Sequence, residues 1–226
     1  CLTVKTDGGE QRFTARRVVG ADGASSLVRR TFYQEPKTRY TAIQQWFPAG
    51  ENRAPFYSCI FDPVTSESCS WIIRKDETLI FGGCFASQGS RDAYECQKSR
   101  LEEYLGHPLS QPIKTEACQA VRPRGFSDFI TGRDGVYLIG EAAGFISASS
   151  FEGISSAIRS GSALAEAMSQ AAEDRELARL YRRKMTSLRL KLWLKTIKRW
   201  FMYTPWVRHI IMRLGLAAIH VEQENK

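Results

Sequence analysis

The chain opens with alternating apolar and polar positions on either side of the turn sequence Asp7-Gly8-Gly9. Period-two alternation around a glycine turn predicts two antiparallel strands, so we expect a β-hairpin over residues 1–19. The second strand is expected to end at Gly20–Gly23. Ser25-Ser26 can then cap a short helix that includes residues 27–30.

Residues 40–121 contain short apolar or alternating runs separated by Pro, Gly, Asp and Asn, which is typical of an antiparallel sheet. A helix over 93–105 is expected to interrupt this sheet, and 113–121 is expected to add one more strand. The four runs before the helix cover residues 41–47, 56–61, 70–74 and 78–83.

A compact apolar strand over 135–140 precedes an acidic, small-residue turn, and a long helix is expected to begin near Phe151. Helical periodicity then continues to the C-terminus, with a break at Thr204-Pro205. Small residues recur along the first of these helices, as they do where a helix packs closely on a cofactor or on another backbone. They are Gly153, Ser156, Ala157, Ser160 and Gly161.

Length and composition are those of a folded chain: 226 residues with 43% apolar and 11% aromatic content can bury a core. No stretch approaches the 18 apolar residues of a membrane span. Residues 179–213 hold 11 Lys or Arg and no Asp or Glu, which leaves 21 basic and 24 acidic residues elsewhere. The net charge of +8 is therefore a local feature of the C-terminal part, and no nucleic-acid-binding motif accompanies it, so we expect no nucleic-acid partner.

Cys1 begins the chain without an initiator Met or a leader segment, so we expect a fragment, with a processed lipoprotein as the alternative. The six cysteines lie far apart, with no CxxC pair and no His at metal-ligand spacing. This predicts reduced thiols in a cytoplasmic protein and no metal site. Cys59, Cys69 and Cys84 lie in apolar strand-like runs and are expected in the core.

Two strand-to-turn segments carry the candidate chemistry. Residues 18–30 form a strand, a glycine turn and a helix start, which predicts backbone N–H groups free to meet an anion, although a bare strand–turn–helix is also an ordinary turn. Residues 135–154 place Glu141 at the carboxyl end of a buried strand, where a carboxylate can bind sugar hydroxyls. A structural or helix-capping role for Glu141 is the alternative.

Residues 20–29 resemble GADGxxSxxR, the second fingerprint of flavoprotein monooxygenases and geranylgeranyl reductases, and residues 140–154 resemble the third, GDAAGxxxPxxGEGI. Both motifs occur in family order, about 118 residues apart. The resemblance implies FAD as the cofactor, with Asp22 near its pyrophosphate and Glu141 at its ribityl chain. The cofactor-binding positions that it implies are Asp22, Gly23, Gly140, Glu141, Ala142, Ala143, Gly144, Glu152, Gly153 and Ile154.

Three positions depart from the third fingerprint: Glu141 replaces Asp, Ala148 replaces Pro and Phe151 replaces Gly. Phe151 is expected to crowd the edge of the flavin. No GxGxxG follows a strand, so the loop for the adenine-side phosphates is expected upstream of Cys1. We therefore expect this piece alone to bind FAD poorly and to be inactive.

The resemblance extends to a bacterial subgroup of flavoproteins linked to colicin M tolerance, in stretches such as 42–47, 55–62 and 138–150. Residues 70–74 fall where the family's reductases carry YxWxFP in the substrate cavity. Only Trp71 matches that motif, which makes it the candidate substrate contact, with a plain core position as the alternative.

The patterns and the resemblance together predict an α+β fold in three parts. Residues 1–30 and 133–168 would form part of an FAD-binding α/β domain. Residues 31–132 would form an inserted antiparallel-sheet substrate domain, and 169–226 a basic helical C-terminal region.

The resemblance implies that the full-length protein is an FAD-dependent oxidoreductase for a hydrophobic substrate, with isoprenoids as the candidate class, and the cysteine pattern predicts a cytoplasmic location. A flavin monooxygenase of the aromatic hydroxylase type is one alternative. A non-catalytic membrane-surface module with a degenerate flavin fold is another. The sequence nominates no catalytic acid or base, because in a flavoenzyme the cofactor carries the redox chemistry.

Residues 188–201 mix Leu, Ile, Trp and Phe with Lys and Arg, which is typical of interfacial helices. Such a segment predicts peripheral binding to anionic lipid at the inner face of the membrane. A helix packed on the body with a solvated basic face is the alternative. The side chains expected to insert are Leu192, Trp193, Ile197, Trp200 and Phe201.

Overall fold

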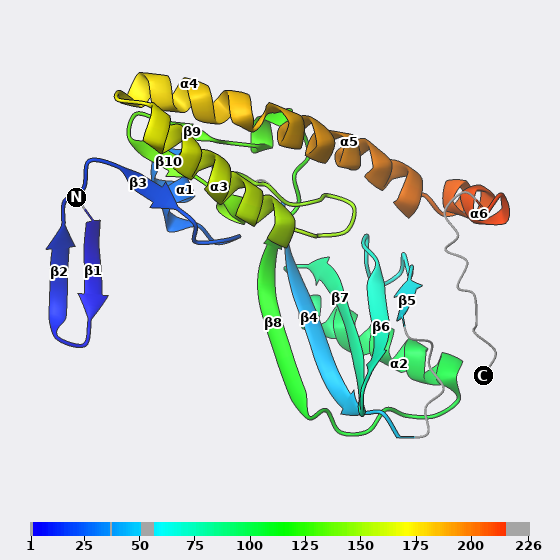
Figure 1. The fold of residues 1–226 in the computed structure, drawn as a ribbon. Helices are drawn as coiled ribbons and strands as arrows, with labels where there is room; N and C mark the ends of the chain where they lie inside the picture. Colours follow the sequence, from blue (N-terminus) through cyan, green and yellow to red (C-terminus); the bar gives the residue numbers. More distant parts are fainter. Residues whose placement is uncertain (1, 37, 51–56, 216–226) are drawn as a thin grey trace. The chain divides into compact units, whose positions relative to one another are not determined.

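The computed structural model describes residues 2–36, 38–50 and 57–215, and it confirms the α+β fold (Figure 1). Cys1 and Phe56, which entered the predictions above, lie outside the described residues. The chain divides into two compact units, which are described separately. The first comprises residues 1–40, 119–147 and 151–193, and the second comprises 41–118, 148–150 and 194–226.

A three-stranded sheet with the order β3-β10-β9 forms the centre of the first unit. Strands β3 (Val18–Gly20) and β10 (Val136–Leu138) run parallel, and β9 (Gly132–Arg133) pairs antiparallel with β10. The backbone N–H of Ile139 donates to the Gly20 carbonyl at 3.0 Å. This bond extends the ladder beyond β10, so the carboxyl ends of β3 and β10 lie next to each other.

The N-terminal hairpin forms as predicted, from β1 (Leu2–Thr6) and β2 (Gly9–Phe13). All of β2 is exposed. The prediction of one extended run over residues 13–19 is wrong, because β2 ends at Phe13 and β3 begins at Val18. The two strands belong to different sheets.

Helices α1 (Leu27–Phe32), α3 (Ile154–Gln170) and α4 (Asp174–Lys184), with the first part of α5 (Thr186–Tyr203), complete this unit (Figure 1). The Tyr181 hydroxyl donates to the Leu138 carbonyl at 2.9 Å, which ties α4 to β10. The largest members of the shared core are Phe129, Tyr137, Leu138, Phe145, Leu164, Leu177, Tyr181, Met185, Leu188 and Leu192.

The first unit therefore reaches past the predicted domain limit at residue 168, because α4 and the start of α5 bury their apolar residues on the same core as β10. Leu192 is 2% exposed and Trp193 packs against this core, so the prediction that both insert into a membrane is wrong. The division into a cofactor part and a substrate part stays a prediction.

The second unit contains a five-stranded sheet with the order β5-β6-β7-β4-β8. The pairs β5–β6 and β6–β7 are antiparallel, as predicted. Helix α2 (Ser90–Leu105) packs on β7 through Phe81, Phe85, Tyr94 and Leu101 (Figure 1). The strands are β4 (Arg39–Pro48), β5 (Tyr57–Ile60), β6 (Ser70–Lys75), β7 (Thr78–Ala86) and β8 (Lys114–Val121).

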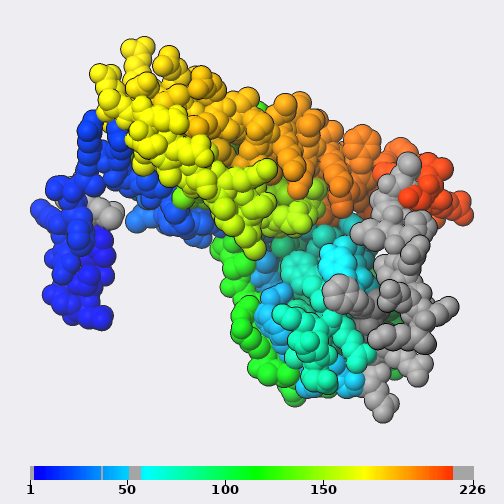
Figure 2. Space-filling model, viewed as in Figure 1, coloured from blue at the N-terminus to red at the C-terminus, as the bar shows by residue number. Residues whose placement is uncertain are grey.

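The last part of α5 and helix α6 (Pro205–Arg213) also belong to the second unit, with Pro205 at the first turn of α6, so the predicted break is confirmed. Residues 194–214, coloured orange to red in Figure 2, form part of the molecular surface. Among the residues that the structure describes, no helix is long and apolar enough to cross a membrane.

The cysteine prediction is only partly correct. All five described cysteines are free thiols, but Cys59, Cys96 and Cys118 are exposed, Cys69 is half-buried and only Cys84 is buried. Strand β5 alternates exposed and half-buried positions, which places Cys59 on its exposed face. A hydrogen bond from the Cys69 thiol, and a weaker one from Tyr57, lower the pKa of Cys59 to about 6, although burial acts in the opposite direction.

This low pKa predicts selective alkylation of Cys59. At pH 6.5 it should react with iodoacetamide about tenfold faster than an ordinary exposed thiol, since its larger thiolate fraction outweighs the lower nucleophilicity of a more acidic thiol. Its rate should rise through about pH 6 and level off above pH 7. Cys69→Ala should slow the reaction at pH 6.5, and Cys96, read by mass spectrometry in the same sample, serves as the control. A Cys59 rate that still rises tenfold between pH 8 and pH 9 would contradict the prediction.

Candidate functional site

The structure brings the two predicted motif segments to one edge of the sheet. Asp22 follows the carboxyl end of β3, and Glu141 follows the carboxyl end of β10. These strands are parallel neighbours, with Leu138 opposite Gly20. The carboxyl ends of adjacent parallel strands are where open α/β sheets bind their ligands. Residues more than a hundred positions apart thus share one candidate site.

Asp22 is bound to the helix that follows it. Its carboxylate accepts hydrogen bonds from the Ser26 hydroxyl at 2.5 Å and from the N–H groups of Leu27 at 2.7 Å and Val28 at 3.2 Å. Partial burial acts to raise the pKa of Asp22, but these hydrogen bonds outweigh it and hold the pKa below its ordinary value. The expectation that this helix start keeps its N–H groups free for an anion is therefore wrong.

Arg29 connects the two segments. Its buried guanidinium donates to the carbonyls of Gln34 at 3.0 Å, Ala142 at 3.1 Å and Asp128 at 3.0 Å. Ala142 lies in the second segment, so a side chain of the first motif holds the backbone of the other. Our sequence reasoning gave Arg29 no role. The signal was present, because Arg29 is the arginine of the GADGxxSxxR string.

Glu141 makes a structural contact, and its contact with a ribityl chain stays a prediction. One carboxylate oxygen accepts a hydrogen bond from the Val121 N–H at 2.7 Å, which is a structural contact. Within the part of the chain that the structure describes, the other oxygen has no partner. Burial raises the pKa of Glu141, while the bond from Val121 acts against that rise. The second oxygen is thus left to accept a hydrogen bond from a ligand hydroxyl.

The small residues around Glu141 permit close packing. Gly144 has a φ of 79°, and a Cβ there would lie 2.5 Å from the Asp128 carbonyl oxygen, so no other residue fits without a shift. Ala142 and Ala143 are buried. The Gly140 N–H donates to the Ser160 hydroxyl of α3 at 2.9 Å. The small residues of α3 therefore pack against the motif backbone, one of the two roles expected of them.

Phe151 has a φ of 54°, in the left-handed region that favours glycine. This explains why the fingerprint has Gly at the position. The Phe151 ring packs edge-on to Tyr40, with centroids 5.4 Å apart, and lies 5.0 Å from the Arg122 guanidinium. The Phe151 ring, which the sequence led us to expect at the flavin edge, thus packs against Tyr40 and Arg122.

Glu152, Gly153 and Ile154 lie at the start of α3. Glu152 is exposed, Gly153 is the N-cap without a side-chain hydrogen bond, and Ile154 is 82% exposed. The first turn of this helix therefore lacks side-chain capping. Gly23, on the β3 side, has a φ of 70°, and a Cβ there would meet no atom within 4 Å. The backbone at Gly23 thus has open space beside it, whereas a Cβ at Gly153 would lie 3.6 Å from the Ile146 side chain.

Trp71 lies on the wall of a cavity of about 570 Å³ in the second unit. Its indole N–H donates to the Gln44 side-chain oxygen at 3.3 Å. A Cβ at Gly82 would lie 2.8 Å from the indole, so the glycine on the neighbouring strand makes room for the ring. The sequence left open whether Trp71 lines a cavity or lies in the core. In the structure it lines the cavity. The other lining residues are Ala42, Ile43, Gln44, Thr115, Glu116, Ala117 and Cys118.

No protein-family model matches the chain. It is 43% identical over 216 residues to protein CbrA of Escherichia coli strain CFT073, a match that covers 95% of this chain and 58% of CbrA. The chain therefore spans less than two thirds of the length of this relative.

Solved structures show the same arrangement of elements. A geranylgeranyl bacteriochlorophyll reductase-like protein from Thermoplasma acidophilum superposes with a TM-score of 0.69 at 17% identity, over 91% of this chain and 54% of that one. Klebsiella pneumoniae HpxO, solved with FAD and uric acid, gives a TM-score of 0.60 at 17% identity, over 94% and 58%. This chain has the fold of FAD-dependent oxidoreductases. At this level of identity the likeness concerns the fold, and the role of each site residue stays a prediction.

Proposed function

We propose that the full-length protein to which this chain belongs is an FAD-dependent oxidoreductase. The observation that carries the proposal is the placement of Asp22 and Glu141 directly after adjacent parallel strands, with Arg29 joining the two segments. The FAD-bound HpxO structure, which shares the fold, supports the same assignment.

The residues present fit part of an FAD molecule. The open oxygen of Glu141 suits a ribityl hydroxyl, and the uncapped first turn of α3 at Gly153 suits a polar acceptor. Asp22 has a structural role, because its hydrogen bonds to α1 hold this helix and the Gly23 turn beside the site. FAD, when bound, supplies the electron-transfer chemistry. The chain's own residues position it, and none is assigned as a catalytic acid or base.

We propose a hydrophobic substrate, with isoprenoids as the candidate class, and the cavity beside Trp71 as its binding site. The cavity walls combine the indole with Ala42, Ile43 and Ala117, and the polar side chains that also line it are Gln44, Thr115 and Glu116. Mostly apolar walls with few polar groups are typical of sites for small hydrophobic molecules. The rival function, aromatic hydroxylation, differs in inserting an oxygen atom into the product.

The visible absorption spectrum of purified full-length protein tests the proposed function. We expect the bands of oxidised flavin at one FAD per chain, and at least a tenfold loss of FAD affinity in Glu141→Ala, about 1.4 kcal/mol. Glu103→Ala, an exposed site on α2, is the matched control and should leave FAD content unchanged. A colourless full-length protein that takes up no added FAD would refute the assignment and favour the non-catalytic module. Product analysis with and without oxygen separates the oxidoreductase from the hydroxylase.

We also propose that the end of α5 and helix α6 contact an anionic membrane surface. Trp200 is 57% exposed and Trp206 is 64% exposed, which is unusual for large aromatic side chains in a water-facing helix. Lys198 and Arg199 lie among them, so the segment offers both apolar and cationic groups.

A further inference from the structure

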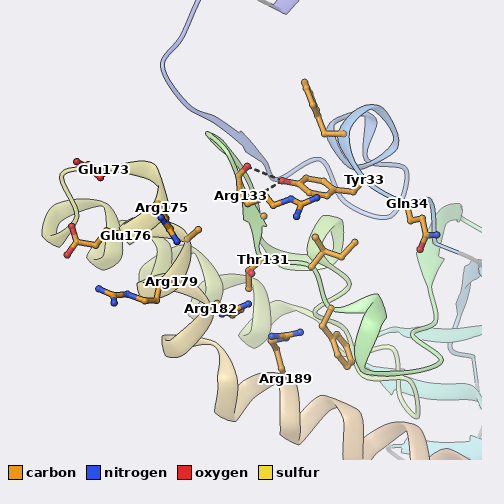
Figure 3. A pocket seen from close by; sticks show the side chains of 15 residues that line it. Tyr33, Gln34, Thr131, Arg133, Glu173, Arg175, Glu176, Arg179, Arg182 and Arg189 are labelled. Atoms are coloured by element: carbon orange, nitrogen blue, oxygen red, sulfur yellow. Dashed lines mark hydrogen bonds between the residues drawn. The ribbon is translucent and has the colours of Figure 1, made fainter.

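A second cavity, of about 940 Å³, lies in the first unit, and arginines make up a third of its lining residues (Figure 3). Its walls come from the end of α1, the segment around β9, helix α4 and the start of α5. The volume is at the upper end of the range for small-molecule sites. The five arginines are Arg133, Arg175, Arg179, Arg182 and Arg189, and two carboxylates, Glu173 and Glu176, also line it.

The positive charge of this cavity is not balanced by its own acids. Within the described residues, Arg175, Arg179, Arg182 and Arg189 form no ion pair. Figure 3 shows the Arg182 and Arg189 side chains beside Thr131, whereas the two glutamates lie at the far end of α4. Arg133 lies 3.5 Å from Asp134, so the other four arginines against two acids leave an excess of two positive charges, and an anion entering the cavity would be attracted.

Arg189 is held in place but is not fully hydrogen-bonded. Its guanidinium lies 4.3 Å from the centroid of the Phe126 ring, a cation–π contact that fixes its position. Its Nε is buried and has no hydrogen-bond partner among the described residues. Burial lowers the pKa of Arg189, and repulsion from Arg182 adds to the effect. Two like charges close together are costly, and an anion held in the cavity between Arg182 and Arg189 would offset that repulsion.

The cavity backs onto the second motif segment on one side, where the Ile130 N–H donates to the Ala143 carbonyl at 3.0 Å, but most of its arginines line the other side. Gly132 and Arg133 precede β10, at the strand end opposite to Glu141. The Tyr33 hydroxyl, at the end of α1, donates to the Val136 carbonyl at 2.7 Å and accepts from the Arg133 N–H at 3.0 Å. Tyr33 is therefore a fixed wall, and a ligand here would bind alongside a cofactor at the other end of the strands.

We propose that this arginine cavity binds a phosphate-bearing small molecule, with Arg182 and Arg189 as its main contacts. Guanidinium groups match phosphate oxygens with paired, charge-assisted hydrogen bonds. The apolar wall of Phe32, Phe129 and Ile130 suits an organic part attached to the phosphates. The cavity thereby explains part of the basic 179–213 segment: Arg179, Arg182 and Arg189 serve this site rather than a membrane face.

Calorimetric titration of the full-length protein with pyrophosphate and with ATP tests the proposal. We expect saturable binding, an affinity that falls with added salt, and a rise in the thermal midpoint on binding. Arg182→Gln combined with Arg189→Gln should weaken binding about tenfold for each arginine lost. The matched control is Arg183→Gln, which removes an exposed charge from the same helix outside the cavity and should change affinity less than twofold.

Three results would overturn the proposal. They are no binding of either probe at millimolar concentration, equal weakening by the control and the double variant, and binding that is seen with phosphatidylglycerol vesicles but with neither soluble phosphate probe. The last would identify a lipid headgroup as the source of the phosphate. Binding can be measured whether or not FAD is present, so this test and that of the flavin assignment can fail independently.

Discussion

Replacing Arg29 with alanine is expected to lower the free energy of unfolding by about 3 kcal/mol or more. The side chain is 2% exposed and donates three hydrogen bonds to backbone carbonyls, those of Gln34, Ala142 and Asp128. Each buried acceptor left without its donor costs about 1–3 kcal/mol, and the cavity adds to that cost. Urea unfolding of the full-length protein measures the loss. FAD content should fall with it, because Arg29 holds the Ala142 backbone.

Arg30→Ala is the matched control for this prediction. Arg30 is the next residue of α1, and its side chain is 41% exposed and lies 3.8 Å from Glu35. An exposed ion pair contributes little, so we expect a change below about 0.5 kcal/mol. Arg29→Lys keeps the charge but cannot span three carbonyls, and should also destabilise the protein. Equal unfolding midpoints for Arg29→Ala and Arg30→Ala would show that the link between the motifs is not structurally important.

The sequence was informative where structure depends on local pattern. The turn at Asp7–Gly9, the strands of the second unit and the helix break at Pro205 all follow from alternation, glycine and proline, and all are observed. The strand before Glu141 was also predictable, because a short apolar run bounded by glycines is typical of a buried strand. The site position follows from these elements through the parallel pairing of β3 and β10.

The sequence was uninformative where structure depends on contacts between distant residues. Nothing local shows that the Asp22 carboxylate is occupied by the N–H groups of α1, or that Glu141 bonds to Val121. Leu192 and Trp193 look interfacial by composition, yet they face the core because α5 begins on the first unit. Cys59 lies in an apolar run but on the exposed face of β5. For Leu192, Trp193 and Cys59 the predicted periodicity is correct, but packing determines which face of the helix or strand is buried.

The exposed end of α5 and helix α6 should bind vesicles that contain anionic lipid. Trp200 and Phe201 pack edge-on at 5.0 Å, and Trp206 follows on α6, so three aromatic side chains are available to insert. If the insertion of each side chain contributes at least about 1 kcal/mol to the free energy of binding, replacing all three with Gln should weaken binding at least about 100-fold. Ile197, which the sequence also nominated, is exposed too.

The cations of the same segment predict a separate salt-dependent part of the binding. Lys198→Gln with Arg199→Gln should cost about 1 kcal/mol per charge near an anionic surface at low salt. The loss should shrink at high salt, because the screening length falls from about 8 Å at physiological ionic strength to about 3 Å at 1 M. The loss caused by the aromatic triple variant should persist, since burial of apolar surface is not screened.

Vesicle co-sedimentation of the full-length protein, with neutral and anionic lipid at low and high salt, separates these two contributions. Tyr104→Gln is the control, because Tyr104 is 87% exposed on α2, outside the proposed surface, and should not affect binding. Comparison with the arginine-cavity variants tests whether Arg182 and Arg189 contribute to lipid binding. Binding that survives the aromatic triple variant, or that is absent from the unmodified protein on anionic vesicles, would leave residues 194–214 as helices with a solvated basic face and remove the membrane proposal.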